Sequence, residues 1–70
     1  MIIVGLRCSN PKFSSTKKVF VKIKDDYEKD EIYVEVAKRC VLSHFNLDRD
    51  STSFWNPELL EGEDLVILKA

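Results

Sequence analysis

The apolar residues between positions 27 and 45 recur at the spacing of an α-helix, and no other feature constrains the fold as much. At about 100° per residue, one broad face collects Ile32, Tyr33, Val36, Ala37, Cys40, Val41 and His44. The opposite face carries the charged residues Glu31, Glu35, Lys38 and Arg39. Because an apolar helix face needs a second layer to cover it, we expect this helix to lie against a β-sheet.

Acidic residues mark the expected start of the helix. Asp25, followed three residues later by Glu28, has the form of a capping box. Asp30 and Glu31 add negative charge where the helix macrodipole favours it. We therefore predict a helix over residues 27 to 45.

Two alternating segments precede the helix and are typical of β-strands. In residues 1 to 8, one face holds Ile2, Val4, Leu6 and Cys8, and the other holds Ile3, Gly5 and Arg7. In residues 17 to 24, the inward face holds Val19, Val21 and Ile23, and the outward face holds Lys18, Phe20, Lys22 and Lys24. Turn-forming residues separate the two segments, so we expect an antiparallel pair.

Three shorter elements are expected after the helix. Residues 51 to 55 have the composition of a short strand, which Asn56-Pro57 should end because proline restricts the residue before it. Residues 57 to 62 indicate one helical turn, with Pro57 at its first position and Gly62 just past its end. Residues 64 to 68 form an apolar run typical of a central strand, which we expect beside and parallel to the first strand.

This order of elements resembles the ubiquitin-like β-grasp fold. The likeness rests on the opening Met1-Ile2-Ile3-Val4, on the helix of residues 30 to 45 and on the closing stretch of residues 60 to 68. We therefore predict a single α+β domain over residues 1 to 70, of order ββαβ(β) and β-grasp-like. In it, one helix packs on a small mixed sheet whose N- and C-terminal strands are adjacent and parallel.

The resemblance also bears on function. Ubiquitin-like modifiers and sulfur carriers end in a Gly-Gly pair, whereas this chain ends in Lys69-Ala70, so the likeness implies neither conjugation nor sulfur transfer. What it does imply is a sheet face, opposite the helix, that family members offer to partner proteins.

The sequence contains few candidates for chemistry. Cys40 and His44 stand four residues apart, but a nucleophilic site also needs an orienting group and an oxyanion site. Asp48 and Asp50 lack the loop glycine and fixed intervals of a calcium site. No glycine-rich phosphate loop or HExxH motif occurs. We expect no enzyme activity, no cofactor and no metal.

Composition bounds the location and the redox state. No run of 18 apolar residues occurs, so we expect no membrane span and a cytoplasmic, intracellular protein. Cys8 and Cys40 match neither a redox motif nor a zinc motif, and we read them as reduced core residues, with a disulfide as the alternative. Since so short a chain buries only a small core, self-association is possible.

Charge is divided unevenly along the chain. Residues 1 to 24 carry six basic and no acidic side chains, whereas residues 25 to 70 carry five basic and twelve acidic ones. An apolar, aromatic patch within a basic rim has the composition of a binding hot spot. The predicted partner-binding residues are Ile3, Arg7, Phe13, Lys18, Phe20, Lys22, Lys24 and Trp55. The alternative is that the loop of residues 9 to 16 covers this patch.

These features predict a small non-enzymatic protein-interaction module, or an inhibitor or regulator, that docks a larger protein through its sheet face. Autonomous regulators of this size include viral and phage proteins. The alternative is single-stranded nucleic-acid binding through the basic hairpin of residues 12 to 24, where a ring alternates with lysines. A pI near 5.7 and twelve carboxylates weigh against a polyanionic ligand.

Overall fold

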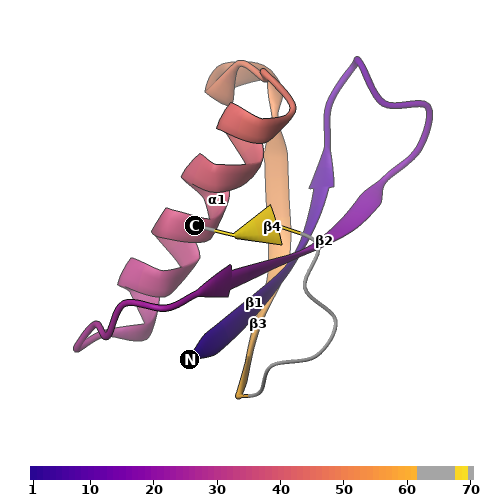
Figure 1. Ribbon diagram of the computed structural model, residues 1–70. Coiled ribbons are helices and arrows are strands. Elements are labelled where there is room, and N and C mark those ends of the chain that lie inside the picture. The colour runs from indigo at the N-terminus through magenta and orange to yellow at the C-terminus, as the bar shows by residue number, and fades with distance from the viewer. Residues whose placement is uncertain (62–67, 70) are drawn as a thin grey trace.

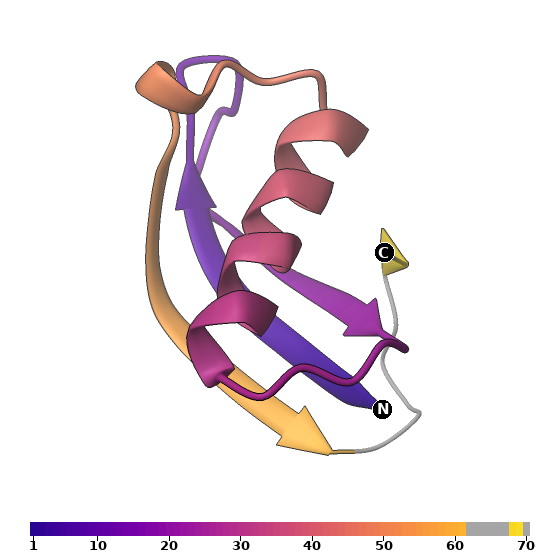
Figure 2. The same cartoon turned by 90° about the vertical axis from the view of Figure 1, so that its left-hand side faces the viewer.

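A computed structural model of the chain describes residues 1–61 and 68–69. Its elements follow the predicted order ββαβ and then a short last strand. They are β1 (Ile2–Ser9), β2 (Lys17–Ile23), helix α1 (Asp30–His44), the 3₁₀ turn η1 (Arg49–Ser51), β3 (Ser53–Glu61) and β4 (Leu68–Lys69). Helix α1 crosses one side of the sheet (Figures 1 and 2).

The strand order in the sheet is β3-β1-β2-β4, which corrects the predicted topology. Strand β1 pairs antiparallel with β2 on one edge and antiparallel with β3 on the other. The last strand, β4, pairs parallel with β2, with Leu68 opposite Val21. The first and last strands are therefore not neighbours, because β3 already occupies the edge of β1 that a parallel C-terminal strand would need. Strand β4 lies at an edge of the sheet rather than in its centre, and residues 64 to 67 of the predicted strand lie outside the described residues.

Strand β3 is longer than predicted because a β-bulge lets it continue past Asn56-Pro57. Gly5 faces Glu58 and Arg7 faces Trp55, so Asn56 and Pro57 together stand opposite Leu6. Asn56 adopts a φ of 52°, in the left-handed region that asparagine tolerates better than most residues. Because β3 is an edge strand, the missing N–H of Pro57 is compatible with pairing to β1. The helical turn predicted at this point is wrong for residues 57 to 61, and Gly62 lies outside the described residues.

Helix α1 begins at Asp30, three residues later than predicted. Lys29 is the N-cap and makes no side-chain capping bond, so the predicted capping box does not form. The segment before it is held by Tyr33 instead. The Tyr27 backbone N–H donates to the Tyr33 hydroxyl at 2.9 Å, and the two rings meet edge to face at 5.2 Å between centroids. This packing keeps Tyr27 outside the helix.

The core lies between α1 and the inner face of the sheet. It contains Val4, Leu6, Cys8, Val19, Val21, Ile23, Tyr33, Ala37, Val41 and Leu68. The inward residues predicted for both strands of the hairpin are thus confirmed, except that Ile2 is only half-buried. The predicted helix face is too wide: Ile32 is 38% exposed, and His44 is exposed. Within residues 1–61 and 68–69, no helix is long and apolar enough to cross a membrane.

The bulge generates a test of the topology. We expect Asn56→Val to destabilise the fold by about 1–2 kcal/mol, because a β-branched residue is strained in the left-handed region. Asn56→Gly should leave stability nearly unchanged, since glycine adopts this φ freely. Urea unfolding of both variants measures the difference.

The matched control is Ser53→Val on the same strand, because Ser53 is exposed and is not among the residues with positive φ. If Asn56→Val unfolds at the same urea concentration as Ser53→Val, the bulge described above is incorrect.

Candidate functional site

The sheet face opposite α1 is the candidate site, and we call it the outer face. Cross-strand pairing arranges it in three rows. Lys22, Ile3 and Leu60 form the first row, Phe20, Gly5 and Glu58 the second, and Lys18, Arg7 and Trp55 the third. In Figure 2 the helix lies on one side of the sheet, and no described helix or strand lies on the other. The outer face therefore combines aliphatic, aromatic and basic side chains on a sheet face that no helix or strand of residues 1–61 or 68–69 covers.

Phe20 and Gly5 form the centre of this face. Gly5 has no side chain, and the ring of its cross-strand neighbour Phe20 occupies the space above it. A Cβ atom on Gly5 would lie 3.2 Å from Phe20 Cε1 and 3.4 Å from Cδ1. This close approach explains why the ring is half-buried although it points away from the core. The absence of a side chain at Gly5 thus allows the Phe20 ring to pack against the β1 backbone.

The apolar part of the outer face extends from this centre toward β3. Trp55 is 37% exposed and Leu60 is 39% exposed, which places both among the large hydrophobic residues left open to solvent. Ile3 was predicted to be available to a partner, but only 4% of it is exposed. It lies between Lys22 and Leu60 and forms the floor of the patch rather than a contact of its own.

Basic side chains lie on one side of the outer face, on β2 and at the end of β1. Arg7 and Lys18 are exposed and Lys22 is half-buried, whereas Glu58 is the one acidic residue among the nine positions of the outer face. The Lys18 ammonium lies 5.1 Å from the centroid of the Phe20 ring and 4.0 Å from Glu58 Oε2. The ion pair is solvent-exposed, so its contribution to stability is small. It orients Lys18 across the patch.

Two predicted site residues are not among the paired positions of the outer face. Phe13 packs edge to face on Phe45, with 5.4 Å between ring centroids, next to the end of α1. Lys24 follows the end of β2 and takes no part in the pairing with β1. Conversely, sequence reasoning missed Leu60 and Glu58, because residues 57 to 62 were assigned to a helical turn. Simple alternation from Trp55 would also have missed them, because the bulge at Asn56-Pro57 shifts the alternation by one residue and so turns Glu58 and Leu60 outward.

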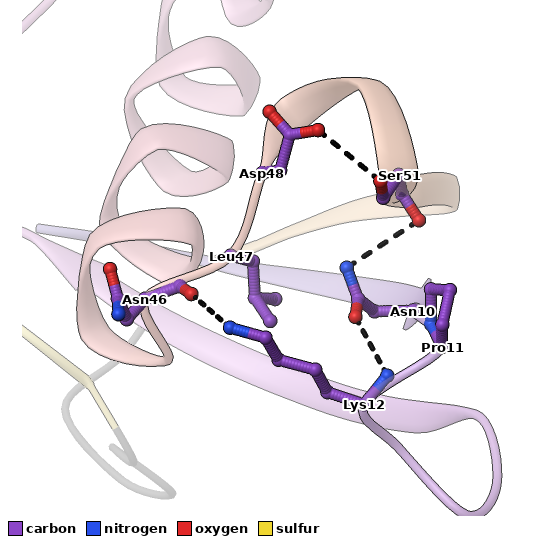
Figure 3. Close-up of a pocket in the computed structure, with 7 residues that line it drawn as sticks. All are labelled: Asn10, Pro11, Lys12, Asn46, Leu47, Asp48 and Ser51. Carbon is purple, nitrogen blue, oxygen red and sulfur yellow. Dashed lines mark hydrogen bonds between the residues drawn. The ribbon is translucent and has the colours of Figure 1, made fainter.

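The loop between β1 and β2 is tied to the helical side of the molecule, at a polar hollow of about 400 Å³ (Figure 3). Lys12 Nζ donates to the backbone oxygen of Asn46 at 2.8 Å. Asn10, only 6% exposed, accepts from Lys12 N at 2.9 Å and donates to Thr52 Oγ1 at 2.8 Å and to Ser51 O at 3.4 Å. With its side-chain bonds used in this way, the loop does not cover the outer face.

The side chains considered for chemistry, His44 and the two cysteines, do not form a reactive site. His44 is exposed and stacks edge to face on Phe45, with 4.8 Å between centroids. Burial raises the pKa of the Cys40 thiol and also that of Cys8, where the charge of Lys17 partly opposes it. A raised pKa lowers the thiolate fraction that a nucleophile needs. In the described part of the chain, no group of three or more His, Cys, Asp or Glu side chains is placed to hold a metal ion.

Comparison with protein-family models, with curated proteins and with solved structures finds no match for this chain. The resemblance to ubiquitin-like domains therefore stays a prediction. The case for function rests on the physical character of the outer face.

The contact between Gly5 and Phe20 generates a prediction. Gly5→Ala should be more favourable in a Phe20→Ala background than in the wild type by about 1 kcal/mol, because the added methyl group meets the ring only when the ring is present. A double-mutant cycle of unfolding free energies measures this coupling. Equal effects of Gly5→Ala in the two backgrounds would contradict the contact.

The polar hollow generates a second prediction. Asn10→Ala should destabilise the fold by about 1–3 kcal/mol, because it removes the acceptor of the Lys12 N–H and both bonds that the buried Asn10 side chain donates. Lys12→Met is the control, since it removes only the exposed bond to Asn46 and should cost much less. Thermal unfolding of the two variants compares them, and an equal cost would show that Asn10 does not anchor the loop.

Proposed function

We propose that this chain is a small non-enzymatic protein-interaction module, of the inhibitor or regulator kind, that docks a larger protein through its outer face. The observation that carries the proposal is the exposure of Trp55 and Leu60 beside Phe20 on a sheet face that no described element covers. Exposed apolar patches with a polar rim occur at interaction sites, and tryptophan and arginine are enriched among the residues that dominate binding energy.

The basic residues of the outer face indicate what kind of partner surface it would bind. Lys18 and Lys22 flank Phe20 on β2, Arg7 lies beside Trp55, and Glu58 already pairs with Lys18. A complementary surface carries an apolar protrusion flanked by carboxylates. Such a surface places its apolar group between Phe20, Trp55 and Leu60, and its carboxylates against the basic rim. Opposite charges of this kind accelerate encounter and set the orientation of docking.

The proposed site of action is the cytoplasm. Cys8 is a free thiol buried in the core, and reduced thiols of this kind are usual in cytosolic proteins.

Single-stranded nucleic-acid binding is the second candidate. The observation in its favour is that Arg7 and Lys18 stand in one row with the exposed ring of Trp55, so that phosphate contacts and base stacking could combine. The contacts of four side chains weigh against it. Lys12 and Lys17, which were expected to extend the basic hairpin, lie against Asn46 and the Phe13 ring instead. The Phe20 ring is seated on Gly5 with Lys18 beside it, which leaves less of the ring for a base.

The test begins with affinity capture from the native host and continues with the purified partner. Phe20→Glu should weaken binding by more than about 30-fold, because it places a carboxylate at the centre of a contact worth about 2 kcal/mol or more. Isothermal titration calorimetry measures the affinity, and circular dichroism verifies that the variant is folded.

Ile32→Glu is the matched control, because Ile32 is an exposed hydrophobic residue on the helix, away from the outer face. It should bind like the wild type. Equal binding by all three proteins removes the outer face as the docking site. A mobility shift with single-stranded oligonucleotides, steeply weakened by salt and abolished by Trp55→Ala, would favour the second candidate instead.

A further inference from the structure

The outer edge of strand β3 is open to another strand. β3 ends the order β3-β1-β2-β4, and no strand of residues 1–61 or 68–69 pairs with that edge. Between β3 and α1 lies a hollow of about 430 Å³, with Val34 of the helix and Leu59 of the strand as apolar walls. Both residues are half-buried. A strand from another chain that adds to this edge would also cover the hollow.

Charged side chains are divided between the two ends of the hollow. Helix α1 runs antiparallel to β3 (Figures 1 and 2), so its first turn lies near the end of the strand. Asp30 and Glu31 stand there, and Glu61 is the last residue of β3. Lys38 stands toward the other end, with its ammonium 5.9 Å from the centroid of the Phe54 ring. One end of the hollow is therefore acidic and the other carries a lysine.

The pairing of β3 with β1 shows which side of the sheet each residue after the bulge faces. Leu59 stands opposite the buried Val4 and faces the helical side, and Glu61 shares that side by alternation. Glu58 and Leu60 face the outer side. A strand added to β3 therefore has to place its own residues on the two sides in the same alternation.

We propose that this edge binds a second copy of the chain, so that two β3 strands pair antiparallel about a two-fold axis at Leu59. The axis is perpendicular to the sheet, and both helices therefore lie on the same side of one continuous sheet. Residues directly opposite each other in an antiparallel pair point to the same side. Glu58 then lies opposite Leu60 of the second copy on the outer side, and Pro57 lies opposite Glu61 of the second copy on the helical side.

The charges of the hollow are complementary to those of a second copy. Rotation about the axis brings the acidic end of one hollow to the level of Lys38 in the other. Lys38 and Pro57 line the same hollow, so Lys38 lies beside Glu61 of the second copy, and symmetry forms the contact twice. Within residues 1–61 and 68–69, neither Lys38 nor Glu61 takes part in an ion pair. Glu35, which also lines the hollow, is already paired with two arginines of its own chain.

Neighbouring registers of the two strands are less favourable. An axis at Glu58 would place two copies of that carboxylate opposite each other, and like charges there are destabilising. An axis at Leu60 would move Glu61 from Pro57 to Leu59, away from Lys38. The axis at Leu59 also leaves Pro57 at the end of the paired segment, where its missing N–H interrupts no ladder.

The first experiment measures the mass of the full chain by sedimentation equilibrium. The mass should rise from one chain toward two as the concentration is raised to about 1 mM, as expected of a small interface. Lys38→Glu and Glu61→Lys should each weaken the dimer by about fivefold or more, because each reverses a charge at both symmetric contacts. The double variant carries opposite charges again and should recover dimerisation. Lys24→Glu, the same charge change at an exposed residue outside the hollow, is the matched control.

The second experiment locates the contact and separates it from the outer face. Isotope-filtered NMR on a mixture of labelled and unlabelled chain should give contacts between Leu59 of one copy and residues 57–61 of the other. Phe20→Glu should leave the dimer unchanged, because the proposal is independent of docking through the outer face. A chain that is monomeric at every concentration, equal effects of Lys24→Glu and Lys38→Glu, no recovery in the double variant, or contacts centred on Phe20 and Trp55 would each overturn the proposal.

Discussion

The fold depends on strand β1 pairing with two neighbours at once. Its hydrogen-bonding edges are both taken, by β2 and by β3, and every other element is positioned by that arrangement. Because β2 and β3 occupy both edges of β1, β4 cannot lie beside β1 and pairs with β2 instead. The bulge at Asn56-Pro57 is what allows β3 to keep its inward residues, Phe54 and Leu59, on the core side along its whole length.

This pairing also divides the molecule into two chemically different sides. The inner face is covered by α1, and the loop of residues 10 to 16 is drawn to the same side by Asn10 and Phe13. The outer face is left with Phe20, Trp55 and Leu60, and with Arg7, Lys18 and Lys22 on β1 and β2. A chain of 70 residues thus has its core on one side of the sheet and a mixed apolar and basic surface on the other.

Six of the nine positions of the outer face were predicted from the sequence. Arg7, Lys18, Phe20 and Lys22 were placed correctly on the outer face, because two-residue alternation within a strand is a local property. Trp55 was also predicted as a partner-binding residue, and it lies opposite Arg7 on the outer face. Phe13 was misplaced because its contact with Phe45 joins parts of the chain that are far apart in sequence. Leu60 and Glu58 were missed because Asn56-Pro57 has the composition of a strand end, and only pairing with β1 makes it a bulge.

The sequence by itself determined the element order ββαβ, the inward residues of the hairpin and the uneven charge, since each follows from residue types and their spacing over a few positions. Only the tertiary structure decided which strand lies beside β1, where α1 begins and that Gly5 seats the Phe20 ring. The physical reason is that these features depend on partners distant in the chain. Strand pairing selects the left-handed φ of Asn56, and the Tyr33 hydroxyl binds the Tyr27 N–H, in ways that local propensity does not encode.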